Sequence, residues 1–222
     1  MWKKGRLLGS GAFGQVFLAL NMEDGSELAV KQVNLHPEAG NGDSQREVQA
    51  LRDEIQLLKE LHHERIVMYY GTEHTSTYPP PPPNHSSCCP LRSIANRLAE
   101  YGCFSVDIVR KYTRQILEGL QYLHDNKIVH RDIKGANVLA TATGDIKLAD
   151  FGASKRLQTI KTVTGFKSIH GTPYWMAPEV VTGQGYGRRS DIWSMGCTVI
   201  EMLTARPPLS DCEPMAALFK IG

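Results

Sequence analysis

The sequence predicts an α+β fold, with antiparallel strands near the N-terminus and mainly helices in the second half. Residues 7–32 have the pattern of a β-hairpin, because a glycine-rich stretch and a short strand are followed by an Asp24-Gly25 turn and a returning strand. Residues 105–124 have the apolar spacing of a long amphipathic helix. Residues 128–152, which follow that helix, hold two short apolar strands, each leading into carboxylates and other polar groups. We expect the chemistry of the protein at these polar loops.

The composition of the chain indicates which classes of protein are to be expected and which are not. With 222 residues, of which 41% are hydrophobic, the chain can bury a core as one large domain or as two small lobes. A formal net charge of +2 gives no sign of a nucleic-acid or membrane surface, and no apolar run is long enough to cross a bilayer. We also expect no secretory leader. The five cysteines are odd in number and lack metal-ligand spacing, which fits free thiols in a cytoplasmic protein.

The glycine-rich stretch indicates a phosphate-binding turn. Gly9, Gly11 and Gly14 lack Cβ atoms, so the backbone there can approach phosphate groups closely and offer its N–H groups. Taken alone, this spacing fits a dinucleotide-binding turn equally well. Such a turn should open a helix, whereas Phe17–Leu20 continues as a strand and Glu27–Gln32 returns as another. The sequence therefore predicts an antiparallel β-ribbon.

A lysine and a glutamate are predicted to pair near this ribbon. Ser44–His62 has a helical pattern that opens with a Ser44-x-x-Glu47 capping box. The apolar stripe of this helix consists of Val48, Leu51, Ile55, Leu58 and Leu61. Glu54 falls on the same face, where a carboxylate without a cationic partner would be costly. Lys31, at the polar end of the returning strand, is the expected partner, and a solvated strand lysine is the ordinary alternative.

Two carboxylates and an amide are expected to converge in the loops of residues 128–152. Asp132 and Asn137 lie five residues apart in one loop, and Asp150 follows eighteen residues after Asp132. Oxygen ligands of this kind suit hard divalent cations. They also leave one carboxylate to accept a proton from a hydroxyl group. The loops therefore predict a site that combines a divalent cation with a general base.

A proline-rich segment interrupts the regular pattern. Ile66–Gly71 reads as a short strand, but Glu73–Arg92 holds six of the twelve prolines of the chain. Five of these, Pro79–Pro83, are consecutive and cannot donate the hydrogen bonds of an interior strand. We therefore expect a polyproline II linker or loop here. Such a run can also recruit SH3- or WW-type domains.

The second half of the chain predicts several helices. Ser93–Tyr101 is expected to be helical and to end at Gly102, and the helix of residues 105–124 is expected to stop at Asn126. The buried face of the longer helix should contain Val109, Tyr112, Ile116, Leu120 and Leu123. Ala153–Glu179 lacks a regular pattern, and irregular segments of this length are usually functional or disordered.

A last pair of helices is predicted near the end of the chain. Asp191 opens an apolar helix, in which it could be a simple N-cap. Pro207-Pro208 is expected to end that helix, and Ala216–Ile221 to begin another.

The two polar loops resemble those of the protein kinases. His130-Arg131-Asp132, with Asn137 five residues later, and Asp150-Phe151-Gly152 match the paired loop motifs of that family. Three further stretches are similar in sequence to the MEKK-type MAP kinase kinase kinases of the STE group. These stretches are Lys111–Gly119, Gly152–Gln158 and Gly171–Met176.

The resemblance implies one kinase domain over residues 1–222, with a bilobal fold. Residues 1–87, with the proline-rich segment 73–92 at their end, would form a small lobe around an antiparallel sheet, and residues 88–222 part of a mainly helical lobe. Kinases continue past the position of Gly222 with further helices, one of which supplies an arginine that pairs with the residue matching Glu179. We therefore expect a domain that is incomplete at its C-terminus, with Glu179 unpaired and the helix after Asp191 partly uncovered.

The resemblance also implies the reaction. Lys134, two residues after Asp132, is typical of Ser/Thr kinases, so the expected reaction is the ATP- and Mg²⁺-dependent phosphorylation of serine or threonine in a MAP kinase kinase. Asp132 would accept the hydroxyl proton, and Lys134 would contact the γ-phosphate. In this family the residue that matches Asp191 ties down the backbone of the loop with Asp132, so Asp191 would do the same here. Asn137 and Asp150 would hold Mg²⁺.

The same resemblance implies which residues surround the nucleotide. Lys31, paired with Glu54, would fix the α- and β-phosphates. Ser86 falls at the gatekeeper position, and Ser87–Cys89 at the hinge, where the backbone of Cys89 would contact adenine. The remaining residues implied around the nucleotide are Leu8, Gly9, Gly11, Gly14, Val16, Ala29 and Leu139.

Arg131 indicates control by phosphorylation, because an arginine at this place can pair with a phosphate added to residues 153–179. Ser168 and Thr172 are the candidate sites, and a purely structural role of Thr172 is an equal alternative. For the chain as a whole, the alternative is a kinase-like isoform or fragment that docks on partners without transferring phosphate. The proline-rich segment and the C-terminal end favour that alternative, whereas the full set of catalytic side chains favours an enzyme.

Overall fold

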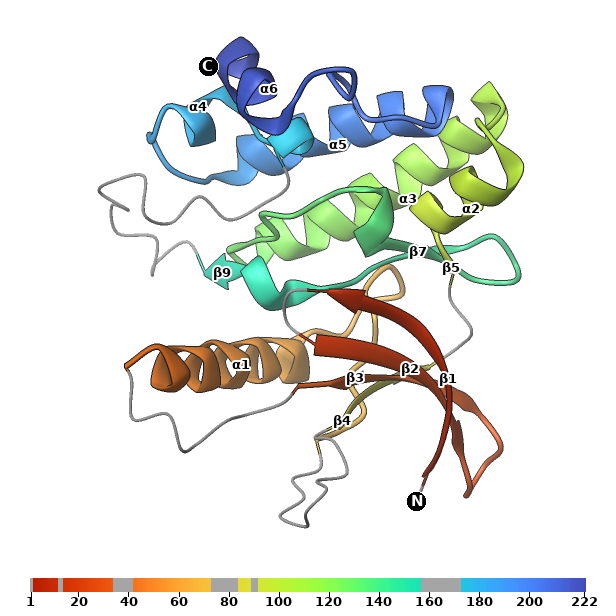
Figure 1. The fold of residues 1–222 in the computed structure, drawn as a ribbon. Coiled ribbons are helices and arrows are strands. Elements are labelled where there is room, and N and C mark those ends of the chain that lie inside the picture. The colour runs from red at the N-terminus through yellow and green to blue at the C-terminus, as the bar shows by residue number, and fades with distance from the viewer. Residues whose placement is uncertain (1, 12–13, 34–41, 73–83, 89–91, 157–172) are drawn as a thin grey trace. The chain divides into compact units, whose positions relative to one another are not determined.

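The structure is a computed structural model that describes residues 2–11, 14–33, 42–72, 84–88, 92–156 and 173–222. The chain divides into two compact units. The first consists of Met1–His62 with Val67–Pro90, and the second of His63–Ile66 with Leu91–Gly222. Strands dominate the first unit and helices the second, which confirms the predicted α+β class (Figure 1).

The first unit is built on a four-stranded sheet in the order β1-β2-β3-β4 (Figure 1). Its strands are β1 (Trp2–Gly11), β2 (Gly14–Asn21), β3 (Glu27–Gln32) and β4 (Asn84–Cys88). All three pairings are antiparallel. The predicted β-ribbon is confirmed, because the glycine-rich stretch leads from β1 into β2 rather than into a helix.

The Asp24-Gly25 turn joins β2 to β3 as predicted. The N–H of Asn21 donates to the carbonyl of Ser26 at 2.8 Å, and the N–H of Gly25 donates to the carbonyl of Asn21 at 2.9 Å. Gly25 has a φ of 73°, which a glycine adopts without steric cost. The Asp24 carboxylate accepts hydrogen bonds from the hydroxyl and the N–H of Ser26, and these bonds lower the pKa of Asp24.

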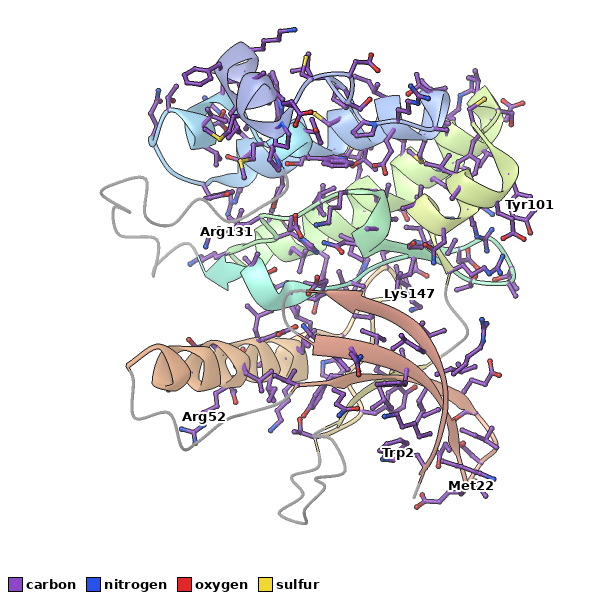
Figure 2. The ribbon with its side chains drawn as sticks, viewed as in Figure 1. Trp2, Met22, Arg52, Tyr101, Arg131 and Lys147 are labelled. Atoms are coloured by element: carbon purple, nitrogen blue, oxygen red, sulfur yellow. The ribbon has the colours of Figure 1, made fainter. Side chains whose placement is uncertain are left out.

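The two faces of this sheet carry different residues. Ala19, Leu28 and Val30 form a buried cluster on one face, and Trp2, which is labelled in Figure 2, packs against it. The strand register pairs Val16 with Lys31 and Leu18 with Ala29. Because directly opposed residues point to the same side of a sheet, Val16, Ala29 and Lys31 share the other face. Three of the residues predicted near the nucleotide therefore lie on one surface.

The helix α1 (Gly42–Glu60) begins earlier than predicted. Its first residue is Gly42, so Ser44 lies inside the first turn and cannot act as the N-cap, which requires a non-helical backbone. The predicted capping box at Ser44 is therefore wrong. The C-terminal part of the apolar stripe is confirmed, because Leu58 and the following Leu61 are buried.

The strand predicted at Ile66–Gly71 is wrong. In this stretch only Ile66 makes a β-bridge, to Leu148, and residues 67–72 belong to no strand. The fourth strand of the sheet is instead Asn84–Cys88, which pairs with β3 so that Val30 opposes Ser86. Residues 84–88 have the N–H groups that the five prolines before them lack, so a ladder can form only after the prolines. The expectation of a linker or loop is thus wrong for residues 84–88, while Pro79–Pro83 lie outside the described residues.

The second unit contains most of the described helices and two small sheets (Figure 1). The helices are α2 (Ile94–Tyr101), α3 (Val106–Asp125), α4 (Pro178–Val181), α5 (Arg188–Thr204) and α6 (Pro214–Ile221). One sheet has the order β5 (Arg92–Ser93), β7 (Val138–Ala140), β8 (Ile146–Leu148), and the other pairs β6 (Ile128–Val129) with β9 (Lys155–Arg156). Short 3₁₀ turns lie at Gly135–Asn137, Phe151–Ala153 and Pro173–Trp175.

The predictions for α2 and α3 are confirmed. The hydroxyl of Ser93 accepts a hydrogen bond from the N–H of Asn96 at 3.1 Å and caps α2, which ends before Gly102. Asn126 is the C-cap of α3. The predicted buried face of α3 is buried in the structure, namely Val109, Tyr112, Ile116, Leu120 and Leu123.

Residues His63–Ile66 belong to the second unit because polar contacts tie them there. The N–H of Leu148 donates to the carbonyl of Arg65 at 2.8 Å, and the ammonium of Lys147, labelled in Figure 2, donates to the carbonyl of Glu64 at 2.7 Å. The Arg65 guanidinium reaches the Glu118 carboxylate of α3 at 3.0 Å.

The helix α5 also begins earlier than predicted. Gly187 precedes its first residue, so Asp191 lies within the first turn and the N-cap alternative for Asp191 is wrong. The helix ends at Thr204, before the two prolines at 207 and 208, and Ala205 has a φ of 59°. Four apolar side chains of α5 are exposed, namely Ile192, Trp193, Ile200 and Leu203. The next helix, α6, begins at Pro214, two residues before the predicted start.

Glu179 has a hydrogen-bond partner in α5, which is a hydroxyl group and not the arginine that kinases supply. Glu179 lies in α4, and its carboxylate accepts a hydrogen bond at 2.8 Å from the hydroxyl of Ser190, in the first turn of α5. The longest described helix, α3, has 20 residues and carries charges along its length, and no described helix is long and apolar enough to span a membrane.

The backbone conformation and the close approach of β3 require a glycine at the start of β2. Gly14 has a φ of 127°, and a Cβ added there would lie 2.0 Å from the carbonyl oxygen of Gln32 in β3. Gly9 has no such restriction, because a Cβ added there meets nothing within 4 Å.

Gly14→Ala should therefore lower the free energy of unfolding by more than about 1 kcal/mol, since the added methyl group meets backbone and the dihedral angle disfavours it. Urea denaturation followed by circular dichroism checks this, with Gly9→Ala as the control that should leave stability nearly unchanged. Equal stability of the two variants would contradict this account of Gly14.

Candidate functional site

A buried carboxylate from α5 holds the loop that follows β6. Asp191 is 0% exposed, and its two oxygens accept hydrogen bonds from the N–H of His130 at 2.9 Å and the N–H of Arg131 at 2.8 Å. The Nε2 atom of His124 lies 2.8 Å from the same carboxylate. A buried carboxylate needs such partners, because an unpaired charge is costly in the protein interior. Asp191 therefore fixes the backbone directly before Asp132.

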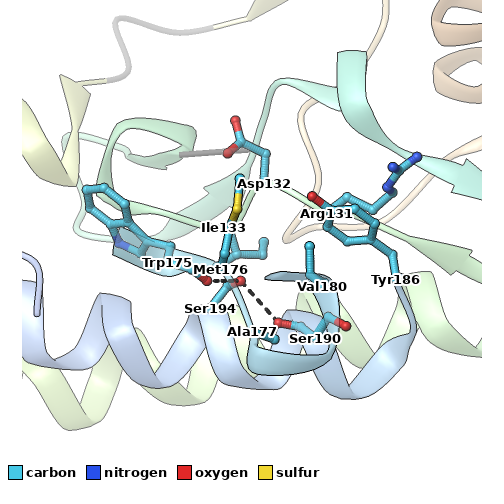
Figure 3. A pocket seen from close by; sticks show the side chains of 10 residues that line it. All are labelled: Arg131, Asp132, Ile133, Trp175, Met176, Ala177, Val180, Tyr186, Ser190 and Ser194. Carbon is cyan, nitrogen blue, oxygen red and sulfur yellow. Dashed lines mark hydrogen bonds between the residues drawn. The ribbon is translucent and has the colours of Figure 1, made fainter. Parts of the chain in front are cut away.

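The backbone at Arg131 is strained and packed. Its φ is 72°, a left-handed conformation that costs a non-glycine residue of order 1–3 kcal/mol. The guanidinium lies 4.1 Å from the centre of the Tyr186 ring (Figure 3), and burial lowers the pKa of Arg131. The Nε atom of Arg131 is buried without a hydrogen-bond partner. Contacts with Asp191 and Tyr186, rather than the intrinsic backbone preference of an arginine, thus hold Arg131 in this conformation.

Asp132, Lys134 and Asn137 come together as predicted. The Lys134 ammonium lies 2.8 Å from the Asp132 carboxylate. The Asn137 side-chain amide donates to the backbone carbonyl and to the carboxylate of Asp132, both at 2.8 Å. The Asp132 carboxylate is thereby held in one orientation by a charge and an amide from its own loop.

The loop with Asp150 is joined to this one by hydrogen bonds. The N–H of Ala149 donates to the carbonyl of Asn137 at 2.9 Å, and the His130 ring nitrogen lies 3.1 Å from the carbonyl of Ala149. Phe151 is 1% exposed and its ring packs 5.1 Å from that of His130. Asp150 itself is exposed, with a φ of 61°. The predicted proximity of the two loops is confirmed.

The donor set of these loops fits a hard cation that keeps part of its water shell. Both hydrogen bonds from the Asn137 amide nitrogen go to Asp132, so the amide oxygen is the atom suited to act as a ligand. The Asp150 carboxylate, on an exposed residue, would supply the second kind of oxygen. Among the described residues no cluster of three or more His, Cys, Asp or Glu side chains could form a complete metal cage. Mg²⁺ is usually bound in this way, by one or two carboxylates together with phosphate and water.

The predicted lysine–glutamate pair forms within the first unit. The Lys31 ammonium of β3 lies 3.1 Å and 3.3 Å from the two carboxylate oxygens of Glu54 on α1. Both side chains are largely buried, with 19% and 10% of their surface exposed. The pairing that hydrophobic patterning predicted is therefore confirmed.

The other residues predicted around the nucleotide are distributed over both units. Leu8, Gly9 and Gly11 lie on β1, and Gly14, Val16 and Ala29 lie on β2 and β3. Leu139 is the half-buried middle residue of β7 in the second unit. Cys89, Ser168 and Thr172 lie outside the described residues.

The pocket next to Asp132 is small. Its volume is about 10 Å³, which leaves room for about a single water molecule. Figure 3 shows the residues that line it: Arg131, Asp132, Ile133, Trp175, Met176, Ala177, Val180, Tyr186, Ser190 and Ser194. The segment around Trp175 is thus packed closely against the loop that carries Asp132.

Two residues of this region were missed by the sequence reasoning. Glu201 on α5 is buried and accepts hydrogen bonds from Gly135 and Trp175. Ser194 donates to the backbone carbonyl of Trp175 at 2.7 Å. A glutamate and a serine within the apolar pattern of residues 191–203 are the signal that could have identified them.

Replacing Asp191 by Asn should lower the free energy of unfolding by about 3 kcal/mol, because an amide cannot accept all the hydrogen bonds that the buried carboxylate accepts. Chemical denaturation measures the change. Asp107, also an aspartate in the first turn of a helix but 88% exposed in its side chain, provides the matched control. Asp107→Asn should barely move the denaturation midpoint, and a similar shift in both variants would argue against the anchoring role of Asp191.

Comparisons with known proteins agree with this geometry. Residues 2–220 match the protein kinase domain family. The whole chain is 54% identical over 227 residues to mitogen-activated protein kinase kinase kinase 3 from Homo sapiens and 47% identical over 223 residues to a protein of the same name from Arabidopsis thaliana. It is 43% identical over 217 residues, 98% of its length, to mitogen-activated protein kinase kinase kinase A from Dictyostelium discoideum. The chain spans 35%, 34% and 22% of the length of these three relatives. The chain belongs to the protein kinase family.

Proposed function

We propose that residues 1–222 form a single kinase domain that transfers the γ-phosphate of ATP to serine or threonine of a MAP kinase kinase. The observation that carries the proposal is the Asp132 carboxylate, which Lys134 and Asn137 both contact at 2.8 Å on a loop fixed by Asp191. The similarity to relatives named mitogen-activated protein kinase kinase kinases supports the choice of substrate.

The proposed chemistry rests on orientation and charge. Asp132 would accept a hydrogen bond from the substrate hydroxyl and take its proton during transfer, which is worth about 10²–10⁴-fold in rate. Lys134, already beside Asp132, would place its positive charge on the transferred phosphate. Transfer of a phosphoryl group needs positioning and charge neutralisation more than covalent help.

The residues proposed to hold Mg²⁺ are Asn137 and Asp150. When bound, Mg²⁺ would neutralise part of the phosphate charge. Asn137 has a second task, because its amide nitrogen orients the carboxylate of Asp132.

The proposed contacts of the nucleotide concern its phosphates and its adenine. Lys31, fixed by Glu54, would bind the α- and β-phosphates, and the backbone at Gly9, Gly11 and Gly14 would approach the phosphates closely. The apolar residues proposed around adenine are Leu8, Val16, Ala29 and Leu139, with a backbone contact at Cys89.

Cellular setting and further partners complete the proposal. Cys103, Cys197 and Cys212 are free thiols, which supports a cytoplasmic protein. The five prolines at 79–83 are proposed to contact an SH3- or WW-type domain. The arrangement of Asp132, Lys134 and Asn137 supports an enzyme over a kinase-like protein that only docks.

Asp132→Asn should reduce transfer of ³²P from ATP to a MAP kinase kinase by about 10²–10⁴-fold, because the amide cannot take the proton. Asp125→Asn, at an exposed position at the end of α3, should retain the activity of the unaltered chain. Phosphoamino-acid analysis of the product should show phosphoserine or phosphothreonine. Full activity of Asp132→Asn, or phosphotyrosine as the product, would refute the proposal.

Combined replacement of Ser168 and Thr172 by Ala should lower turnover while leaving the KM for ATP nearly unchanged, because the phosphate proposed to pair with Arg131 can no longer be added. Steady-state kinetics with varied ATP separates the two quantities. Thr159→Ala, in the same stretch, is the control and should leave turnover intact. Unchanged turnover in the double variant would exclude both sites.

A further inference from the structure

An open groove in the second unit runs along the first half of α3, the helix labelled in Figure 1, and we call it the α3 groove. Its volume is about 500 Å³, which is within the range of sites that bind ligands. The charged residues that line it are four cations, Arg65, Arg110, Lys111 and Arg114, and two carboxylates, Asp107 and Glu118. The wall of the groove therefore has a net charge of +2, four positive against two negative. The whole chain has no more than this, so its excess of positive charge is concentrated here.

The cations of the α3 groove differ in how far their charges are already used. Arg65 is largely buried, and its guanidinium lies 3.0 Å from the Glu118 carboxylate and 3.5 Å from that of Asp145. It therefore forms part of the wall. Arg114 also reaches Glu118, at 3.1 Å, but 83% of its side chain is exposed. The exposed Lys111 makes no hydrogen bond or ion pair with any residue that the structure describes.

The groove favours negative charge next to it. Hydrogen bonds from Arg65 above all, with the charges of Arg65 and Arg114, lower the pKa of the Glu118 carboxyl group. A hydrogen bond from Thr143 above all, with the charges of Arg65 and Lys111, lowers the pKa of Asp145. A carboxylate of a ligand that enters the groove would meet the same cations.

The spacing of the exposed cations matches that of alternate side chains in an extended chain. Arg110 and Arg114 are four residues apart on α3, so they share one face and are separated by a rise of about 6 Å. Side chains on one face of an extended chain repeat every 6.6 Å, approximately. Two carboxylates at alternate positions of a peptide can therefore meet both arginines. An arginine can also bind a carboxylate through two parallel hydrogen bonds.

The mixture of charges favours a peptide over a nucleic acid. Asp107 lies 2.7 Å from Arg110, and Glu118 lies beside Arg114, so each arginine has a carboxylate next to it. A phosphate backbone carries closely spaced negative charges, which these carboxylates would repel. A protein segment can place its carboxylates only where the groove has cations.

We propose that the α3 groove binds an extended acidic segment of a partner protein, whose glutamate or aspartate side chains pair with Arg110, Lys111 and Arg114. Binding of this kind is separate from phosphate transfer, because none of the three residues belongs to the site proposed for that reaction. It should take place with or without a nucleotide.

Fluorescence anisotropy with a labelled peptide of about twelve residues, in which glutamate and alanine alternate, tests the proposal. The same peptide with glutamine in place of glutamate should bind at least about tenfold more weakly. Lys111→Gln and Arg114→Gln should each weaken binding of the glutamate peptide by about threefold to fivefold, and the double variant by more than about tenfold. Raising the salt from about 50 mM to about 500 mM should weaken it further, because salt screens exposed charges.

Two further variants serve as controls. Arg189→Gln removes the same charge from an exposed arginine in the first turn of α5, outside the groove, and should leave binding unchanged. Asp107→Asn removes the carboxylate that pairs with Arg110 and should strengthen binding by about twofold to threefold. A chain that does not fold cannot gain affinity, so Asp107→Asn decides the question even if Lys111→Gln or Arg114→Gln does not fold.

Three results would overturn the proposal. The first is no binding of the glutamate peptide at about 1 mM, or equal binding of the glutamine peptide. The second is an equal loss of binding in Arg189→Gln and in the groove variants. The third is tighter binding of single-stranded RNA or of phosphatidylserine vesicles than of the peptide, lost in Lys111→Gln, which would assign the groove to another class of partner. These measurements use no ATP, so failure of the proposed kinase function would leave their outcome unchanged.

Discussion

The buried carboxylate of Asp191 accepts hydrogen bonds from two backbone N–H groups, and the site of the second unit depends on this interaction. The hydrogen bonds offset the free-energy cost of burying the charge of Asp191. They also hold Arg131 in a left-handed conformation that a short loop would not keep by itself. The place of Asp191 in the first turn of α5 adds to this, because a negative charge is favoured at the positive end of a helix. This arrangement determines the position of Asp132.

A single helix thus arranges several segments. Asp191, Ser194 and Glu201 lie along α5, and they bind the start of the loop that carries Asp132, the backbone of Trp175 and the backbone of Gly135. Because the rise along a helix is fixed, the spacing of these three side chains sets the spacing of the segments that they hold. Rigid support of this kind is what phosphoryl transfer requires, since its catalysis depends on positioning.

The sequence could predict features that follow from local patterns. The apolar stripe of α1 placed Glu54 on a buried face, and burial required a cation, which led to Lys31. The start of α1 was missed because a serine three residues before a glutamate also occurs inside a first turn. The strand Asn84–Cys88 was missed because its residues have no apolar alternation, so its pairing with β3 comes from tertiary structure. The place of Glu201 within an apolar pattern was a signal that it is buried, but its partner at residue 135 is a backbone N–H, so no side-chain pattern could reveal the contact.

Native-state hydrogen exchange of the unaltered chain tests the central claim most directly. If Asp191 fixes the loop, the amides of His130 and Arg131 exchange as slowly as the buried interior of α3, for example at Ile116 and Leu120, because all of them open only when the unit unfolds. Exchange at His130 and Arg131 as fast as in the partly exposed turn of residues 141–144 would show that the loop opens independently, and would contradict the account.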